Sequence, residues 1–234
     1  MLRSLLNSHA ILRIADVLGR RQENRISEFG MLAQAFEFLK TNGISGDYFE
    51  FGLWQGKTFT WARMMAKRYQ VNGVKFRGFD SFQGLPAPAE TQYNIWSQGQ
   101  FAFGRREFEQ VLAKKGFRTD EYELTEGFYD KTLTPELASQ LQARGVKASI
   151  VYIDADLYES TRDALRFVKP FLQDGTILCF DDYFAYRGRP DMGEQRALAE
   201  FQEANPNLHM LPYVLYGSLG MSFLHYSSSV PKVS

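Results

Sequence analysis

The sequence has little of what marks secreted, membrane-bound or nucleic-acid-binding proteins. It contains a single cysteine, Cys179, so it cannot form an internal disulfide, which agrees with the reducing cytoplasm as its location. Neither charge is in excess, since 27 lysines and arginines balance 27 aspartates and glutamates, and composition favours neither nucleic acid nor an anionic membrane as a partner. Residues 1–18 are amphipathic and lack the unbroken apolar run of a signal peptide or membrane span. We expect a cytoplasmic protein.

A further absence concerns dinucleotide cofactors. The run Glu50-Phe51-Gly52-Leu53-Trp54-Gln55-Gly56 has glycines on both sides of a turn, but Trp54 stands where a G-x-G-x-x-G motif needs glycine. That motif lets the backbone approach a pyrophosphate closely, so its loss disfavours NAD and FAD. A glycine turn that leads into a helix still suits a different ligand. Glycine lets the ligand approach the backbone closely, and the helix N-terminus favours negative charge.

The chain does contain enough apolar sequence for a large core, because 44% of its 234 residues are hydrophobic and 15% are aromatic. This length fits one large α/β domain, or a domain with a short extension. We expect a helical extension over 1–43, with helices over 5–18 and 26–39, and a main domain over 44–234. The extension could be a lid or a dimer surface, or could only cover one sheet edge. The sequence leaves open whether the protein forms a homodimer or a higher homo-oligomer.

From residue 47 onward, strand-like and helix-like patterns alternate. The expected strands are 48–52, 74–80, 122–125, 150–153, 176–182, 208–213 and 219–226. The expected helices are 58–69, 105–115, 135–144, 158–172 and 193–204. The last two strands are too close for a crossover helix, so they should form an antiparallel pair. We therefore predict an α/β fold: a doubly wound, mostly parallel, seven-stranded sheet with one antiparallel strand.

Three aspartates end two neighbouring strands of this sheet. Asp154 follows 150–153, and Asp181 and Asp182 follow the apolar run that begins at Thr176. The helical pattern between them makes a βαβ unit, whose strands are parallel and adjacent. Their carboxyl ends then share the edge where open α/β sheets hold ligands. Three carboxylates at one place repel each other unless a cation lies among them, and oxygen ligands suit Mg²⁺, Mn²⁺ or Ca²⁺ and not zinc.

A local explanation of the same aspartates stays open. Asp154 or Asp156 could cap the helix that begins near Tyr158, and Asp182 could lie in an ordinary turn.

Two further acids end the first two strands. Glu50 lies at the end of the first strand, where it could hold an ammonium or hydroxyl group of a cofactor. Asp80 ends the second strand, where an acid commonly binds both ribose hydroxyls of an adenosyl cofactor. Thr58 and Ser81, next to these turns, belong to the expected cofactor site.

Several segments resemble the macrocin O-methyltransferase family, whose members are metal-dependent and use S-adenosylmethionine. These segments are 48–56 (YFEFGLWQG), 78–86 (GFDSFQGLP), 127–133 (GFYDKTL), 153–161 (IDADLYEST) and 180–183 (FDDY). The resemblance implies a class I methyltransferase fold and methylation of a sugar hydroxyl, typically on a glycosylated natural product. It is weakest at the N-terminal helices and the tail, so it says least about the substrate.

Carried onto this sequence, the resemblance implies a cofactor site and a metal site. Glu50, Gly52 and Gly56 would line the methionine part of S-adenosylmethionine, and Asp80 would hold its ribose. Gly127 and Phe128 would lie near the adenine, although Phe128 could instead belong to the core. Asp154, Asp181 and Asp182 would bind Mg²⁺ or Mn²⁺.

The residue that removes the proton from the acceptor is left open. Asp154 or Asp156 could serve, whereas His209 and His225 are expected to be structural. Metal-dependent catechol methyltransferases have a lysine three residues after the first ligand, and here that position is Leu157. This departure disfavours a catechol acceptor.

Two rival interpretations remain: a metal-dependent methyltransferase of a catechol-like aromatic, and a non-catalytic protein that binds S-adenosylmethionine for a partner. The expected acceptor is a small-molecule glycoside. The irregular stretch 81–104 is rich in aromatic residues, which could stack on a sugar or a planar aglycone, or could pack the loop onto the domain.

Overall fold

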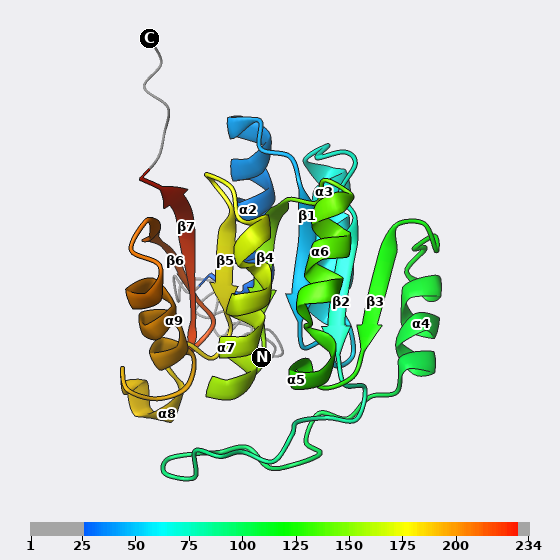
Figure 1. The fold of residues 1–234 in the computed structure, drawn as a ribbon. Coiled ribbons are helices and arrows are strands. Elements are labelled where there is room, and N and C mark those ends of the chain that lie inside the picture. The colour runs from blue at the N-terminus through cyan, green and yellow to red at the C-terminus, as the bar shows by residue number, and fades with distance from the viewer. Residues whose placement is uncertain (1–25, 229–234) are drawn as a thin grey trace, which may run out of the picture.

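The computed structural model describes residues 26–228. The helix expected over 5–18 lies outside these residues. Figure 1 shows one sheet with helices on both of its faces. Its strands are β1 (Asp47–Phe51), β2 (Phe76–Asp80), β3 (Tyr122–Glu126), β4 (Ala148–Ile153), β5 (Ile177–Phe180), β6 (Leu208–Tyr216) and β7 (Gly220–Ser227). The helices are α2 (Glu28–Asn42), α3 (Lys57–Arg68), α4 (Arg105–Lys114), α5 (Tyr129–Thr132), α6 (Pro135–Ala143), α7 (Tyr158–Val168), η1 (Lys169–Phe171), α8 (Ala185–Gly188) and α9 (Gly193–Ala204).

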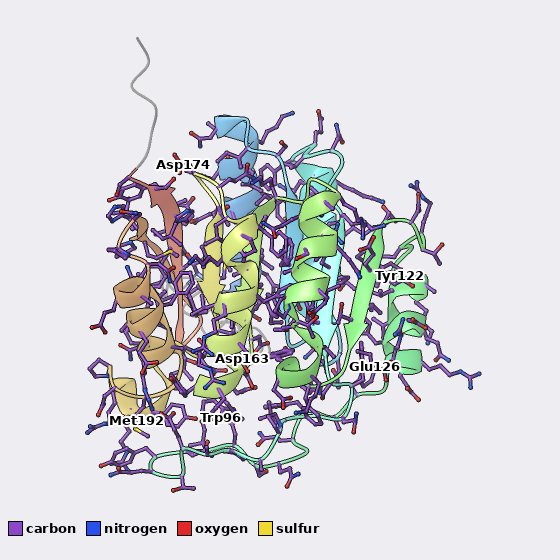
Figure 2. All side chains as sticks on the ribbon, viewed as in Figure 1. Trp96, Tyr122, Glu126, Asp163, Asp174 and Met192 are labelled. Carbon is purple, nitrogen blue, oxygen red and sulfur yellow. The ribbon has the colours of Figure 1, made fainter. Side chains whose placement is uncertain are left out.

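The sheet topology confirms the predicted fold class. The seven strands run in the order β3-β2-β1-β4-β5-β7-β6. The first five strands of this order pair in parallel, and β7 pairs antiparallel with both β5 and β6, so β7 is the one reversed strand. Because the parallel strands share a direction, their carboxyl ends lie along one edge. Figure 2 shows Trp96, Glu126 and Met192 at this edge and Asp174 at the opposite one.

Each central strand is buried on both faces, which explains its continuous apolar sequence. On one face, Tyr48, Tyr152 and Cys179 belong to a core shared with α2, α3 and α4. On the other face, Phe51 and Ile153 belong to a core shared with α6, α7 and α9. Side chains alternate between these faces along each strand, so residues two apart share a face. This alternation carries over to the side chains that follow each strand.

Helix α2 corresponds to the second helix of the predicted extension. Ser27 caps it by accepting a hydrogen bond from the N–H of Gly30 at 3.2 Å, and Gly43 ends it in the left-handed conformation at φ 65°. Met31 and Leu32 are buried in the same core as α3. Ile26, just before the helix, forms a parallel bridge with Tyr216 of β6. Helix α2 therefore packs on the main domain, while the proposed division at residue 43 stays a prediction.

The structure differs from the predicted elements at a few places. Helix α7 stops at Val168 and continues as the short η1, because Pro170 has no N–H to extend the α-helical pattern. The short helices α5 and α8 were not expected from the sequence. Strand β6 extends to Tyr216 and is irregular between Pro212 and Leu215. The stretch 81–104 contains neither helix nor strand, as expected, and runs along the carboxyl edge of the sheet (Figure 1).

Candidate active site

The carboxyl edge of the sheet brings the predicted acids together because the parallel ladders continue past the strand ends. The N–H of Gly52 donates to the carbonyl of Phe79 at 3.0 Å, and that of Asp154 donates to Phe51 at 2.9 Å. The N–H of Asp181 donates to the carbonyl of Ile153 at 3.0 Å. The backbones of Gly52, Asp154 and Asp181 are thus fixed by the neighbouring strands.

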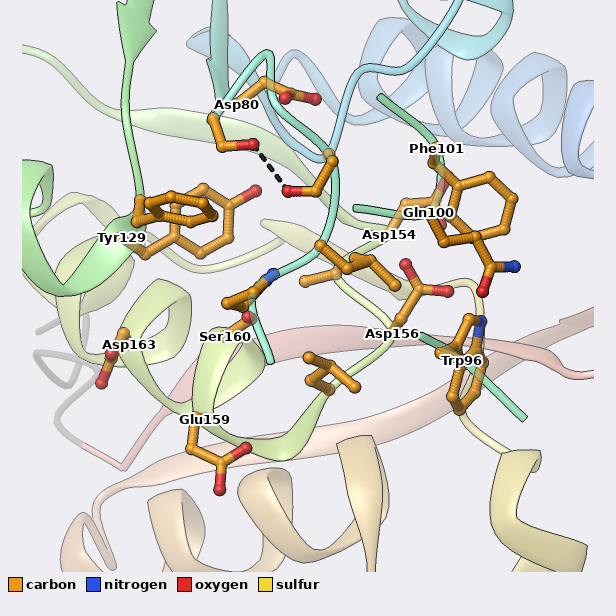
Figure 3. Close-up of a pocket in the computed structure, with 18 of the residues that line it drawn as sticks. Asp80, Trp96, Gln100, Phe101, Tyr129, Asp154, Asp156, Glu159, Ser160 and Asp163 are labelled. Carbon is orange, nitrogen blue, oxygen red and sulfur yellow. Dashed lines mark hydrogen bonds between the residues drawn. The ribbon is translucent and has the colours of Figure 1, made fainter. Parts of the chain in front are cut away.

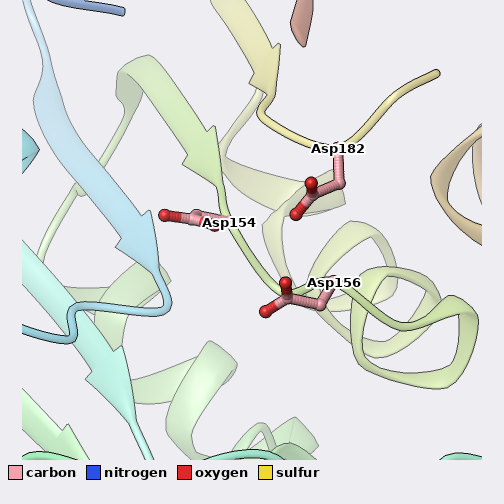
Figure 4. Close-up of side chains that lie close together, drawn as sticks. All are labelled: Asp154, Asp156 and Asp182. Carbon is pink, nitrogen blue, oxygen red and sulfur yellow. The ribbon is translucent and has the colours of Figure 1, made fainter. Parts of the chain in front are cut away.

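Three carboxylates form a compact group at this edge. Asp154, Asp156 and Asp182 each offer one oxygen, and these oxygens lie within 4.8 Å of one another. Figure 4 shows Asp156 and Asp182 facing the same space beside Asp154. Asp156 reaches this position through a left-handed backbone, with φ 60°, an uncommon conformation for a residue other than glycine. Such a backbone strain is typical of functional sites.

Asp181 is oriented differently from its neighbour Asp182. Its Oδ1 accepts a hydrogen bond from the hydroxyl of Tyr152 at 2.5 Å, and it does not belong to the compact group, although it borders the same cavity. The role of Asp181 as a metal ligand stays a prediction. Sequence reasoning proposed Asp156 as a base, whereas the structure also places it among the clustered carboxylates.

Burial and mutual repulsion raise the pKa values of these acids. Burial, then the charges of Asp181 and Asp156, hold the pKa of Asp154 well above its usual range. Burial, the charge of Asp182 and a hydrogen bond to Asp182 raise the pKa of Asp156 to about 9. Burial and the charge of Asp181 raise the pKa of Asp182 to about 7, against a lowering hydrogen bond to Asp156.

This donor set fits a hard divalent cation. Its ligand atoms are all carboxylate oxygens, which Mg²⁺ and Mn²⁺ prefer, and they repel each other when nothing positive lies between them.

Sequence reasoning missed a buried acid behind this group. Glu194, in the first turn of α9, has its Oε2 3.1 Å from the N–H of Asp182, from which it accepts a hydrogen bond. Burial, followed by the charges of Asp182 and Asp181, raises the pKa of Glu194 well above its usual range. Its Oε1 has no hydrogen-bond partner within residues 26–228. The sequence offers no signal for this contact, because an acid in the first turn of a helix is common.

A cavity of about 710 Å³ lies in front of the aspartates. Four of the predicted cofactor residues line it, namely Gly52, Asp80, Ser81 and Phe128. The four aspartates predicted to bind metal or to act in catalysis line it as well, namely Asp154, Asp156, Asp181 and Asp182. In Figure 3, Trp96, Gln100 and Phe101 lie on the side of Asp156, while Asp80 and Tyr129 lie on the other side. The remaining predicted cofactor residues, Glu50, Gly56, Thr58 and Gly127, are not among the lining residues.

The carboxylate of Asp80 fixes the turn after β1. Its Oδ2 accepts the N–H of Leu53 at 2.6 Å and that of Trp54 at 3.3 Å, and its Oδ1 accepts the N–H of Phe82 at 2.6 Å. Burial raises the pKa of Asp80, and these backbone hydrogen bonds oppose the rise. Asp80 therefore has a structural role at the cavity wall, and its contact with ribose stays a prediction.

Glu50 lies within the core behind the cavity. It is wholly buried and accepts hydrogen bonds from the hydroxyl of Tyr48 and, at 2.6 Å, from that of Thr58. Burial raises its pKa to about 8, although both hydrogen bonds act in the other direction. These contacts tie β1 to the start of α3. The roles of Glu50 and Thr58 in cofactor binding stay predictions.

The turn glycines are required by packing within the protein. A Cβ atom on Gly56, which has φ 71°, would lie 2.7 Å from the ring of Phe108. Gly52 approaches the backbone of Asp154 even more closely. The close approach expected at these positions therefore involves the protein's own atoms.

Some aromatic residues of 81–104 line the cavity, where they could stack on a ligand, and others pack the loop onto the domain. Trp96 and Phe101 line the cavity, and Phe101 packs edge-on against Trp54 with ring centroids 5.5 Å apart. Phe82 and Phe103 instead pack on the core shared with α4.

The two late-strand histidines lie away from the aspartates. The N–H of His225 donates to the carbonyl of Thr176 at the start of β5, so it lies toward the opposite end of that strand from Asp181. A nitrogen of the His225 ring contacts the carbonyl of His209 at 3.2 Å.

The sequence pattern of one family, described as Macrocin-O-methyltransferase (TylF), matches residues 22–209. The chain belongs to the macrocin O-methyltransferase family. The matched range includes β1 to α9, and so it includes every residue of the candidate site. The resemblance seen in the sequence is thereby confirmed. Among residues 26–228, no helix of this family member is both long and apolar enough to cross a membrane.

Two curated relatives are similar to most of the chain at low identity. One is the 8-demethyl-8-(2,3-dimethoxy-alpha-L-rhamnosyl)-tetracenomycin-C 4'-O-methyltransferase of Streptomyces olivaceus, 24% identical over 65% of this chain and 58% of the relative. The other is the mycinamicin III 3''-O-methyltransferase of Micromonospora griseorubida, 26% identical over 65% of this chain and 61% of the relative. The matched part thus spans less than two thirds of the length of these relatives.

The solved structure of the O-methyltransferase NovP has the same fold. It superposes with a TM-score of 0.68 at 20% sequence identity and covers 84% of this chain and 78% of NovP. The fold is therefore that of class I O-methyltransferases.

Proposed function

We propose that this family member is an S-adenosylmethionine-dependent O-methyltransferase that uses Mg²⁺ or Mn²⁺ and methylates a sugar hydroxyl of a glycosylated small molecule. The observation that carries the proposal is the group of Asp154, Asp156 and Asp182 at the wall of a cavity of about 710 Å³. This volume falls within the range of small-molecule and cofactor sites. Membership of the family, and the rhamnosyl group in the name of the Streptomyces olivaceus relative, support the same function.

The cofactor would lie along the walls formed by the turns after β1, β2 and β3. Gly52, Asp80, Ser81 and Phe128 line this part of the cavity and are the residues that we assign to it. When bound, S-adenosylmethionine supplies an electrophilic sulfonium methyl group. The chain's own contribution is to orient the two reactants and to exclude water from between them.

The metal would be held by Asp154 and Asp182 of the compact group, together with Asp181, the third ligand that the family resemblance implies. A bound divalent ion lowers the pKa of a coordinated hydroxyl and orients it. Asp156 is then the carboxylate that we assign to accept the hydroxyl proton, because one of its oxygens lies within 4.8 Å of oxygens of Asp154 and Asp182. Asp154 remains the alternative base if it does not bind the metal.

The acceptor would enter on the side of Trp96 and Phe101. These aromatic side chains line the cavity beside Asp156 (Figure 3) and offer flat apolar surfaces to a sugar or an aglycone. A pyranose ring presents one apolar face, so stacking leaves its hydroxyls free to point at the carboxylates.

Calorimetric titration tests this function first. S-adenosylmethionine is titrated into the protein with Mg²⁺ and with EDTA, and Mg²⁺ is then titrated into the cofactor complex. We expect both ligands to bind, and methyl transfer to glycosides with vicinal hydroxyls in preference to catechols. Cofactor binding without any response to metal would contradict the metal-dependent mechanism, and failure to bind the cofactor would contradict the whole proposal.

A further inference from the structure

The hydroxyl of Tyr152 contacts one carboxylate of the site, that of Asp181. It donates to Oδ1 at 2.5 Å, in the range of a hydrogen bond to an ionised oxygen. Tyr152 is wholly buried near the carboxyl end of β4 and is not among the residues that line the cavity. Its hydroxyl therefore contacts the site through the carboxylate of Asp181.

The sheet register brings the two residues together. Tyr152 pairs with Cys179 in the parallel ladder of β4 and β5, and Asp181 lies two residues farther along β5 on the same face. The backbone of Asp181 is held by its N–H bond to Ile153. Its side-chain rotation is therefore the freedom that the Tyr152 hydroxyl removes.

The ring of Tyr152 is itself held in place by its neighbours. The ring of Tyr216 packs beside it with centroids 6.3 Å apart, and both residues are buried in the core under α2. A hydroxyl on an immobile ring fixes the direction of a hydrogen bond better than one on an exposed side chain, because few rotamers fit the packed space.

We propose that Tyr152 is a positioning residue for the metal site. By binding Oδ1, it turns the carboxylate of Asp181 so that the other oxygen faces the cavity and binds the divalent ion beside Asp154 and Asp182. This inference rests on the proposed metal-dependent function. Asp181 borders the cavity, and its carboxylate lies outside the compact group of Asp154, Asp156 and Asp182.

Tyr152→Phe tests the proposal because it removes only the hydroxyl. Loss of a hydrogen-bond partner of a metal ligand typically lowers metal affinity about 10- to 100-fold, and we expect a loss in this range for Mg²⁺ by calorimetry on the cofactor complex. Affinity for S-adenosylmethionine should not change. Tyr216→Phe is the matched control, since it removes a buried hydroxyl beside the same ring that makes no hydrogen bond to a site carboxylate within residues 26–228. Equal Mg²⁺ affinity in the two variants would overturn the proposal.

Asp181→Asn shows whether Tyr152 acts through Asp181. The asparagine keeps an oxygen that can accept from Tyr152 but has no charge for the metal, so Mg²⁺ affinity should fall. Adding Tyr152→Phe to Asp181→Asn should then cause no further loss, because the two residues act on one ligand. Additive losses would contradict this mechanism. If Tyr152→Phe does not fold, Asp181→Asn still decides, since wild-type Mg²⁺ affinity would remove Asp181 from the ligands and with it the role of Tyr152.

The wild-type protein separates this inference from the proposed function. If the wild type transfers methyl groups without binding Mg²⁺, the metal-dependent mechanism itself is wrong. If the wild type and Tyr152→Phe bind Mg²⁺ equally well, only the role of Tyr152 is wrong.

Discussion

The backbone of Gly52 passes so close to Asp154 that a Cβ atom on residue 52 would lie 1.8 Å from the Asp154 carbonyl oxygen. This contact joins the turn that borders the cofactor side of the cavity to the strand end that carries the first aspartate of the acidic group. Gly52 also has φ 88°, a conformation that favours glycine. Both the space at its Cβ position and its backbone conformation therefore disfavour any side chain at residue 52.

Gly52→Ala should therefore destabilise the protein strongly. A positive φ in a residue with a Cβ, together with overpacking against backbone, should cost on the order of 3 kcal/mol in the free energy of unfolding. Urea denaturation measures this change. Gly145→Ala is the matched control, because Gly145 has φ 72° but nothing within 4 Å of its Cβ position. An equal fall in the free energy of unfolding in the two variants would show that the contact with Asp154 does not contribute to stability.

Asp182→Asn should separate metal binding from folding. Removing one of the clustered charges relieves repulsion, so we expect the metal-free protein to unfold at the same or a higher temperature than the wild type. The rise in melting temperature that Mg²⁺ gives to the wild type should be lost, since a ligand stabilises only the protein that binds it. Thermal unfolding with Mg²⁺ and with EDTA measures both effects. An undiminished response to Mg²⁺ would exclude Asp182 from the metal site.

The metal-free protein should lose stability as the pH rises. The pKa values of Asp182 and Asp156 are raised to about 7 and about 9 in the folded state. Because the folded protein then binds more protons than the unfolded chain, the stability from these groups is complete below the unfolded pKa of about 3.9 and is lost as the pH rises through 7 and 9.

Unfolding curves in EDTA between pH 5.5 and 9 (about the range of these titrations) check this dependence. Asp156→Asn should make the fall in stability less steep at the alkaline end of this range. A wild-type protein that is equally stable across the range would contradict the predicted pH dependence. With saturating Mg²⁺, the decline should shrink, because metal binding favours the ionised carboxylates.

Phe101→Ala should weaken acceptor binding more than cofactor binding. The side chain is 38% exposed at the cavity mouth and packs against Trp54, so its loss removes a flat apolar surface without opening the core. An aromatic contact of this kind is worth roughly 0.5–1.5 kcal/mol, which predicts up to about a 10-fold rise in the KM for a glycoside. Steady-state kinetics at saturating S-adenosylmethionine measure the rise. Tyr226→Ala, at an aromatic that is 46% exposed and does not line the cavity, should leave this KM unchanged.

The fold was predictable because its signals are local. Short apolar runs marked the strands, helical spacing marked the helices between them, and the short connection near Gly217 identified the antiparallel pair. The helices that the sequence missed, α5 and α8, are only four residues each, too short to show a helical period.

The site was predictable to the level of its strand ends. Asp80, Asp154, Asp181 and Asp182 lie where the βαβ pattern put them, because parallel strands carry their carboxyl ends to one edge. The partners of these acids were not predictable. Glu194 belongs to α9, and its contact with Asp182 depends on how this helix packs against the end of β5.

By itself, the sequence determined the order of strands and helices, the acids at their carboxyl ends and the family, since each depends on residues close together in the chain. The tertiary structure decided which carboxylates meet. A left-handed backbone brings Asp156 to Asp154 and Asp182, and a tyrosine on the neighbouring strand binds one oxygen of Asp181. Backbone conformation at a single residue and side-chain contacts between strands leave no periodic pattern, so only packing in three dimensions fixes them.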